Sequence, residues 1–222
     1  MRLLPLLLAL AFPVLAHAAA ASGSQRLAAL AVACLMAVVC WSLRARPWVF
    51  SLAILLCAAV LAALLATGRA DLLLLFPPVL ITVAVGLVFA RTLAPGRTPL
   101  VERVVRALDP EALEDPQVPG YARQVTRLWA LFLFGLAFVN ALLALIAVPG
   151  GLLHALGLVP RVQVSQTQWS LFANVLNYLL IGAGFVAEYG YRRWRFPQRE
   201  HRAFGEFLRR IARLGPAFWR ES

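Results

Sequence analysis

Five polar side chains lie in or at the end of two long apolar stretches, where they could bind a polar group. They are Asn140 in the stretch 128–148, and Asn174, Asn177, Glu188 and Arg192 in or just after the stretch 169–190. A lipid-facing helix avoids such groups, because each desolvated polar group costs free energy. At about 100° per residue, one face of a helix over 169–190 collects Ser170, Asn174, Asn177, Ile181, Gly184 and Glu188. We therefore expect this face to contact protein rather than lipid.

The chemistry available to these residues is hydrogen bonding and ion pairing. Glu188 lies one helical turn before Arg192, a spacing that favours an ion pair. Asn140 and Asn177 lie at similar depths in their helices, and a hydrogen bond between them would contribute about 1 kcal/mol in a membrane. Two interpretations stay open. Polar contacts between membrane helices are common, which favours a role in holding two helices together, and the alternative is a small pocket for a lipid headgroup or an acyl-chain substituent.

Motifs for covalent or metal chemistry are absent from the sequence. It contains no glycine-rich nucleotide loop, no Cys-x-x-Cys, no His-Glu-x-x-His and no Gly-x-Ser-x-Gly. All three cysteines lie in apolar stretches, where thiols are usually inert: Cys34, Cys40 and Cys57. All three histidines are isolated in the sequence: His17, His154 and His201. The sequence therefore favours a protein that needs no cofactor and is not an enzyme.

Composition places the chain among helical membrane proteins. It is 62% hydrophobic, and its mean hydropathy is +0.79, beyond what a soluble domain carries. Runs of roughly 20 apolar residues predict an all-α, polytopic transmembrane bundle of about six spans. The spans are predicted at about 3–21, 27–43, 48–66, 72–90, 128–148 and 169–190. They make up a transmembrane domain over 1–196, followed by a basic tail over 197–222.

The first and fourth spans carry features of their own. The first resembles a secretory signal with a cleavage site at Ala16-His17-Ala18, but its length favours an uncleaved helix. In the fourth, Pro77-Pro78 removes two backbone donors and should kink or unwind the helix.

Two polar segments are expected on the cytoplasmic side. In the loop 91–127, Thr98-Pro99 is typical of a helix cap followed by a first-turn proline, opening a helix through Leu108. An acidic, proline-broken loop is expected from Asp109 to Gly120. In the tail 197–222, apolar and arginine residues alternate at helical spacing, which predicts an amphipathic cytoplasmic helix on anionic lipid.

The basic residues orient the bundle. All 21 are arginines, and the formal net charge is +11. In a soluble protein this balance would suggest nucleic acid, but here the arginines gather at the ends of apolar spans, so we expect a membrane lipid partner and no nucleic acid. With both termini in the cytoplasm, only Arg26, Arg69 and Arg161 lie outside. Cleavage of the first helix would place the new amino terminus outside and leave the other spans unchanged.

The last two spans contain the segments QVTRLWALFLFGLAFVNALLAL and WSLFANVLNYLLIGAGFVAEYGYRR. These segments resemble a family of small proteobacterial inner-membrane proteins encoded in gene clusters for aryl-polyene pigments of the xanthomonadin type. The matching residues are Arg123, Thr126, Trp129, Asn140, Trp169, Asn174, Tyr178, Glu188, Tyr189, Arg192 and Arg193. A looser likeness extends to FPPVLI and TPLVERVVRAL, and the tail beyond Phe196 is longer than is typical of the family.

The resemblance implies an accessory membrane protein that helps to make, anchor or hand on a polyene lipid. Other membrane proteins or acyl-carrier proteins of the pigment cluster would be its partners. Some members bear a ketosynthase label, but a condensing enzyme needs a reactive cysteine and histidines in a soluble double-layered fold. Two alternatives stay open: a component of a lipid transporter or flippase, and an integral-membrane acyl-transfer enzyme.

Overall fold

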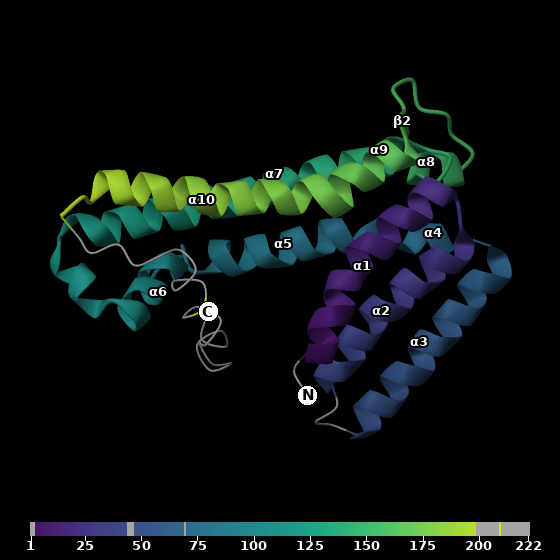
Figure 1. Cartoon of the computed structure of the whole chain (residues 1–222), viewed down its shortest axis with the longest axis horizontal. Coiled ribbons are helices and arrows are strands. Elements are labelled where there is room, and N and C mark those ends of the chain that lie inside the picture. Colours follow the sequence, from purple (N-terminus) through teal and green to yellow (C-terminus); the bar gives the residue numbers. More distant parts are fainter. Residues whose placement is uncertain (1–2, 44–46, 69, 199–208, 210–222) are drawn as a thin grey trace. The chain divides into compact units, whose positions relative to one another are not determined.

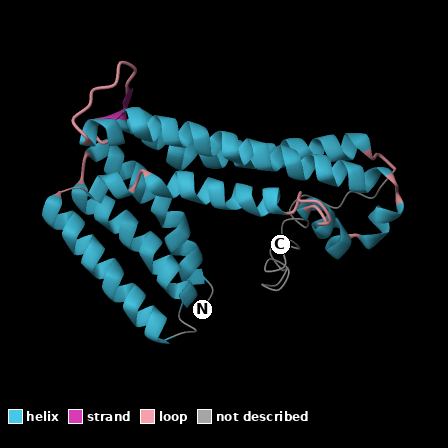
Figure 2. Cartoon of the chain, turned by 180° about the vertical axis from the view of Figure 1, so that it is seen from behind, coloured by secondary structure: helices cyan, strands magenta, loops and turns pink. Residues whose placement is uncertain are grey.

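The computed structural model describes residues 3–43, 47–68, 70–198 and 209, and almost all of its regular structure is helical (Figures 1 and 2). The predicted all-α class is confirmed. The chain forms two compact units: the first contains Met1–Leu80 and Phe138–Tyr178, and the second contains Ile81–Ala137 and Leu179–Ser222. The predicted amphipathic helix of the tail lies outside the described residues except for its first two positions and Arg209, as do Arg44, Arg46 and Arg69.

Three antiparallel helices open the first unit: α1 (Leu3–Ser22), α2 (Gln25–Leu43) and α3 (Pro47–Thr67) (Figure 1). Their bounds agree closely with the first three predicted spans. Gly23 makes the turn between α1 and α2 with φ of 64°, a conformation that glycine adopts without strain. Alanines fill the contact between α1 and α2, among them Ala16, Ala19, Ala28 and Ala31. Such small side chains let two helix backbones approach closely.

The predicted fourth span is divided between two helices, α4 (Ala70–Leu73) and α5 (Phe76–Arg91). The fourth predicted span is therefore not one continuous helix, and its interruption agrees with the kink or unwinding expected beside the proline pair. The break falls at the buried residues Leu74 and Leu75, directly before the proline pair. Pro77 and Pro78 lie in the first turn of α5, where their missing N–H groups break no helical hydrogen bond.

A tight connection joins the two longest helical segments within the first unit. The helix α7 (Gln117–Ile146) runs into β1 (Ala147–Val148), which pairs in parallel with β2 (Val164–Ser165). Between the strands lies α8 (Leu152–Ala155). The last segment then begins at α9 (Gln166–Leu171), passes through the π-helical turn η2 (Phe172–Leu176) and continues as α10 (Asn177–Arg195). Ser165 caps α9 in a capping box with Gln168, so this segment starts earlier than the predicted 169.

In the second unit, two predictions about the segment before α7 are wrong. The helix α6 (Leu100–Leu108) is not capped by Thr98: Pro99 occupies the cap position and makes no side-chain bond. Instead, Thr92 Oγ1 accepts the Leu100 N–H at 3.0 Å and Thr126 Oγ1 accepts the Val101 N–H at 3.2 Å. Two threonines outside the helix thus satisfy amide groups that a local cap would have bonded.

The second of these errors concerns the expected loop. The 3-10 helix η1 (Pro110–Glu114) interrupts it, and α7 already begins at Gln117. Pro119 lies in the first turn of α7, where proline is tolerated, so it does not mark a loop.

Among the described residues, two helical segments are long and apolar enough to cross a bilayer. They are Gln117–Ile146 and Gln166–Arg195, with mean hydropathies of 2.3 and 1.6 in their most apolar windows. Shorter apolar helices lie at Leu7–Ser22, Gln25–Val38, Phe50–Ala63 and Phe76–Arg91. Length and composition thus associate the protein with a membrane.

Candidate functional site

The polar face predicted for the last segment is its inward face. Ser170, Asn174 and Asn177 are 0%, 5% and 3% exposed. The next positions of the same face, Ile181, Gly184 and Glu188, are partly buried. Leucines on the other sides of this segment are exposed, among them Leu171, Leu176 and Leu179. This segment therefore turns its amides inward and exposes several leucines, whereas a soluble helix exposes its polar side chains.

Within the first unit, α1 brings a histidine to this face. His17 Nδ1 lies 3.2 Å from Ser170 Oγ, although 153 positions separate the two residues in the chain. Asn174 Nδ2 donates a hydrogen bond to the same Ser170 oxygen at 3.1 Å. The Ser170 hydroxyl can then donate its proton toward His17 Nδ1 when the ring carries its own hydrogen on Nε2. We call this arrangement the His17–Ser170–Asn174 cluster.

The expectation that all histidines are isolated is therefore wrong for His17. The local sequence shows His17 only as a polar residue among alanines, because its contact depends on how α1 packs against α9. This packing is observed directly, since α1 contacts both α9 and η2. The sequence gives one indication of this contact: a histidine inside an apolar helix needs a hydrogen-bonding partner, because burying it without one costs free energy.

Unused hydrogen-bonding capacity surrounds this cluster. Asn174 Oδ1, Asn177 Oδ1 and Trp169 Nε1 are buried and have no hydrogen-bond partner among the described residues. Leaving one such group unsatisfied costs about 1–3 kcal/mol. Asn174 also lies in η2, and π-helical turns within α-helices occur frequently at functional sites. The region therefore offers two acceptors and one donor to a ligand or to water.

Asn140 is fully buried in the part of α7 that belongs to the first unit. Its predicted hydrogen bond with Asn177 stays a prediction.

A second polar cluster lies in the second unit, around Glu188. Tyr121 Oη donates to Glu188 Oε1 at 3.0 Å, and Arg192 Nε lies 3.5 Å from the same oxygen. The predicted ion pair between Glu188 and Arg192 is confirmed. The Tyr121 ring also packs edge-on against Phe196, with ring centroids 5.3 Å apart. This carboxylate is thus already bonded within the protein, and its contacts fasten the start of α7 to the end of α10.

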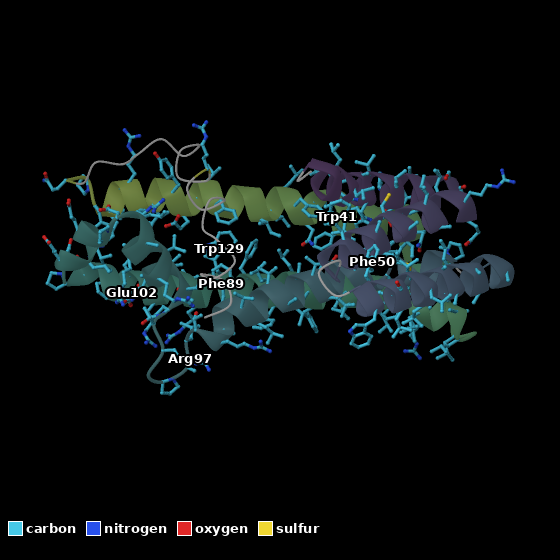
Figure 3. All side chains as sticks on the ribbon, turned by 90° about the horizontal axis from the view of Figure 1, so that it is seen from below. Trp41, Phe50, Phe89, Arg97, Glu102 and Trp129 are labelled. Atoms are coloured by element: carbon cyan, nitrogen blue, oxygen red, sulfur yellow. The ribbon has the colours of Figure 1, made fainter. Side chains whose placement is uncertain are left out.

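Aromatic packing continues this contact between α7 and α10, where the Trp129 and Phe185 ring centroids lie 4.5 Å apart. Helix α5 adds Phe89, whose ring centroid lies 6.1 Å from that of Trp129 (Figure 3). A Cβ placed on Gly184 would lie 3.1 Å from the Trp129 ring, so glycine permits this close approach. The five candidate residues therefore divide: Asn140, Asn174 and Asn177 belong to the first unit, and Glu188 and Arg192 belong to the second.

We predict that Glu188→Gln and Arg192→Gln each change stability by only about 0–1 kcal/mol, because partly exposed ion pairs contribute little. The glutamine at position 188 can still accept the Tyr121 hydrogen bond. Thermal unfolding of the purified protein in detergent checks this. A much larger loss in Glu188→Gln than in Arg192→Gln would show that the carboxylate has a role beyond the ion pair.

The described residues contain no group of three or more His, Cys, Asp or Glu side chains placed to hold a metal ion. No protein-family model, curated protein or solved structure matches the chain.

Proposed function

We propose that this protein is a multi-pass inner-membrane accessory protein in the synthesis or assembly of aryl-polyene lipids. In this role, the region around the His17–Ser170–Asn174 cluster holds the polar end of the lipid. The observation that carries the proposal is the set of buried, unbonded atoms Asn174 Oδ1, Asn177 Oδ1 and Trp169 Nε1. The resemblance of the last two spans to proteins of pigment clusters supports the polyene class.

The chemistry of these atoms favours a neutral polar group over a charged one. An amide oxygen accepts a hydroxyl or N–H hydrogen, and the indole N–H donates to a hydroxyl or carbonyl oxygen. No arginine or acid is needed to bind such a group, which agrees with the cost of burying a charge. A lipid combines this neutral head with a chain that suits the apolar surroundings.

The proposal is tested by deleting the gene and extracting the cell envelope. We expect the absorbance of membrane-bound polyene to fall strongly and to return when the full chain is supplied again. Total membrane protein and growth serve as controls. Unchanged polyene in the deletion strain would refute the role in pigment assembly.

The six-span topology belongs to the same proposal and can be tested separately. Reporter fusions after Ser24, Arg69 and Gln163 should read outside, and fusions after Gly96 and Ser222 should read inside. The expected pattern follows from the arginines, because translocating them across the membrane is unfavourable. An inside signal at Gln163 would contradict six spans.

Acyl transfer is a second candidate, which the contact between His17 and Ser170 favours. A serine hydroxyl 3.2 Å from an imidazole nitrogen has the separation of a nucleophile and its base. The serine proton would pass to His17 Nδ1 as the oxygen attacked an acyl carbonyl. The bond from that carbonyl to the donor's alcohol or thiol would then break, and His17 would return the proton to this leaving group. A fluorophosphonate probe that labels the protein but not its Ser170→Ala variant would favour this activity over simple lipid binding.

A further inference from the structure

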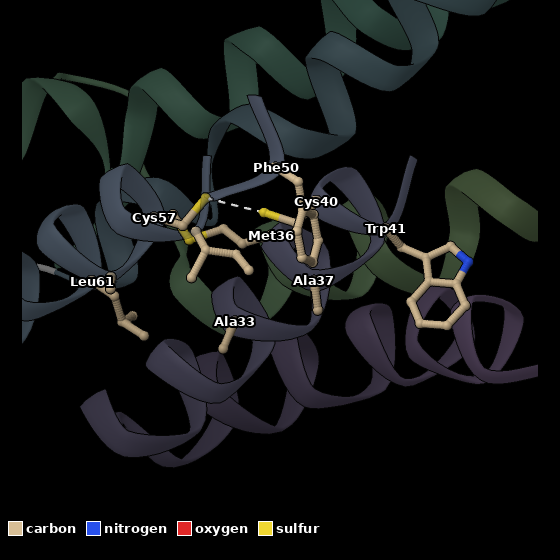
Figure 4. A pocket seen from close by; sticks show the side chains of 10 residues that line it. Ala33, Met36, Ala37, Cys40, Trp41, Phe50, Cys57 and Leu61 are labelled. Atoms are coloured by element: carbon tan, nitrogen blue, oxygen red, sulfur yellow. Dashed lines mark hydrogen bonds between the residues drawn. The ribbon is translucent and has the colours of Figure 1, made fainter. Parts of the chain in front are cut away.

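Helices α2 and α3 line a partly open apolar cavity of about 330 Å³ in the first unit, and two thiols lie in its wall (Figure 4). Cys40 of α2 and Cys57 of α3 face each other with their Sγ atoms 3.8 Å apart. Met36, one helical turn before Cys40, lines the same cavity with its thioether side chain. Three sulfur-containing side chains from two helices therefore gather at one place, and the remaining lining is aliphatic or aromatic.

The separation of the two thiols suits chelation of a single metal ion. With metal–sulfur bonds of about 2.3 Å, two ligand sulfurs lie about 3.8 Å apart at a tetrahedral angle and about 4.0 Å apart at the angle of about 120° in a three-ligand site. The 3.8 Å observed between Cys40 and Cys57 is close to both values. The two helices hold the thiols at this spacing, so chelation by both would need little movement of either thiol.

The types of ligand select the ion. Thiolate and thioether sulfur are soft donors, which favour Cu(I). Structural zinc sites take four nitrogen, oxygen or thiolate ligands, whereas this cavity offers two thiols and a thioether.

The net charge of the ion and its ligands also favours Cu(I). A monovalent ion bound by one thiolate, one neutral thiol and one thioether has no net charge, as an apolar cavity requires. Binding would break one S–H bond, release its proton to solvent and transfer no electron.

We propose that Cys40, Cys57 and Met36 form a Cu(I)-binding site. The site is separate from the His17–Ser170–Asn174 cluster and does not depend on the function proposed above. Cys34 provides a matched control, because it lies on the same helix but not in the lining of the cavity.

The test uses the full chain, purified in detergent under anaerobic conditions, with its thiols shown to be reduced by a colorimetric count. Cu(I) is supplied as its complex with a chromophoric chelator, and the protein should withdraw one ion per chain. Changes around metal ligands already cost about 10–100-fold in affinity, so Cys40→Ser and Cys57→Ser should each cost more than about 100-fold. Met36→Leu should cost less, and Cys34→Ser should bind like the unchanged protein.

X-ray absorption of the copper-loaded protein provides a readout that does not depend on any variant. We expect a shell of sulfur neighbours alone. No stoichiometric uptake by the reduced protein, an equal loss in Cys34→Ser, or a shell of nitrogen or oxygen would each overturn the proposal.

Discussion

Replacing Gly151 with alanine is expected to prevent the folded protein from accumulating. Gly151 is buried after β1, and its N–H donates to the Ala147 carbonyl oxygen at 2.8 Å. A Cβ on Gly151 would overlap that same oxygen and lie 2.7 Å from the Ala147 nitrogen. Both are backbone atoms, so no change of rotamer can relieve the overlap. Overpacking costs about 1–3 kcal/mol where side chains can shift, and we expect a larger cost here.

Alanine substitutions at two further glycines should cost less than Gly151→Ala, and they serve as its controls. A Cβ on Gly150 would lie 2.8 Å from the Gln166 side chain, which can move, so Gly150→Ala should be milder. A Cβ on Gly135, in α7, would meet nothing within 4 Å. Gly135→Ala should be neutral or stabilising by up to about 1 kcal/mol, because alanine is the better helix former.

The measurements are the amount of protein in the membrane fraction and the Tm in detergent for all three variants. Normal accumulation and an unchanged Tm for Gly151→Ala would contradict the backbone packing described for this turn.

Replacing Asn174 with leucine is expected to abolish the polyene lipid while the amount of protein stays normal. The change removes the Nδ2 hydrogen bond to Ser170 and the unbonded Oδ1 that we assign to the ligand. Each lost hydrogen bond costs about 1 kcal/mol, and an unsatisfied ligand group costs about 1–3 kcal/mol more. The sum corresponds to a loss of binding of roughly 100-fold, since about 1.4 kcal/mol is a factor of ten. Protein folding should suffer little, because Ser170 keeps its contact with His17 and the buried, unbonded Asn174 Oδ1 is removed.

The control for Asn174→Leu is Thr167→Val, which changes an exposed polar residue of α9 and should leave the product unchanged. Asn177→Leu removes the second unbonded acceptor and should resemble Asn174→Leu. If these amides only hold helices together, each substitution costs about 0.6–2 kcal/mol, and product falls in step with the amount of protein. That proportional fall would refute a binding role for this face.

Local patterns in the sequence predict much of the fold. The length of each apolar run predicts where a helix lies, because a helix satisfies its backbone hydrogen bonds within its own segment, whatever surrounds it. The first three predicted spans agree with α1, α2 and α3 for this reason. The errors occur at boundaries. Thr92 and Thr126, which lie eight and 25 positions from the amides they bond, satisfy the first amides of α6, so the local cap expected at Thr98 is not needed.

Helical spacing also predicts one contact of the polar residues. Glu188 and Arg192 lie four residues apart, and an α-helix brings such neighbours together wherever it packs. By the same periodicity, Ser170, Asn174 and Asn177 share one face, and their burial agrees with this prediction.

The sequence by itself determined the helical class, the inward face of the last segment and the ion pair at its end, because these depend on neighbours within a few turns. Only the tertiary structure brought His17 to Ser170, Tyr121 to Glu188 and Cys40 to Cys57. Each of these contacts joins two helices, and it depends on the rotation and depth at which one helix packs against another. Apolar side chains on nearly every face leave that rotation undetermined, since a uniformly hydrophobic helix has no preferred side. The packing of small residues and the pairing of a few polar groups then decide how each helix is rotated against its neighbour.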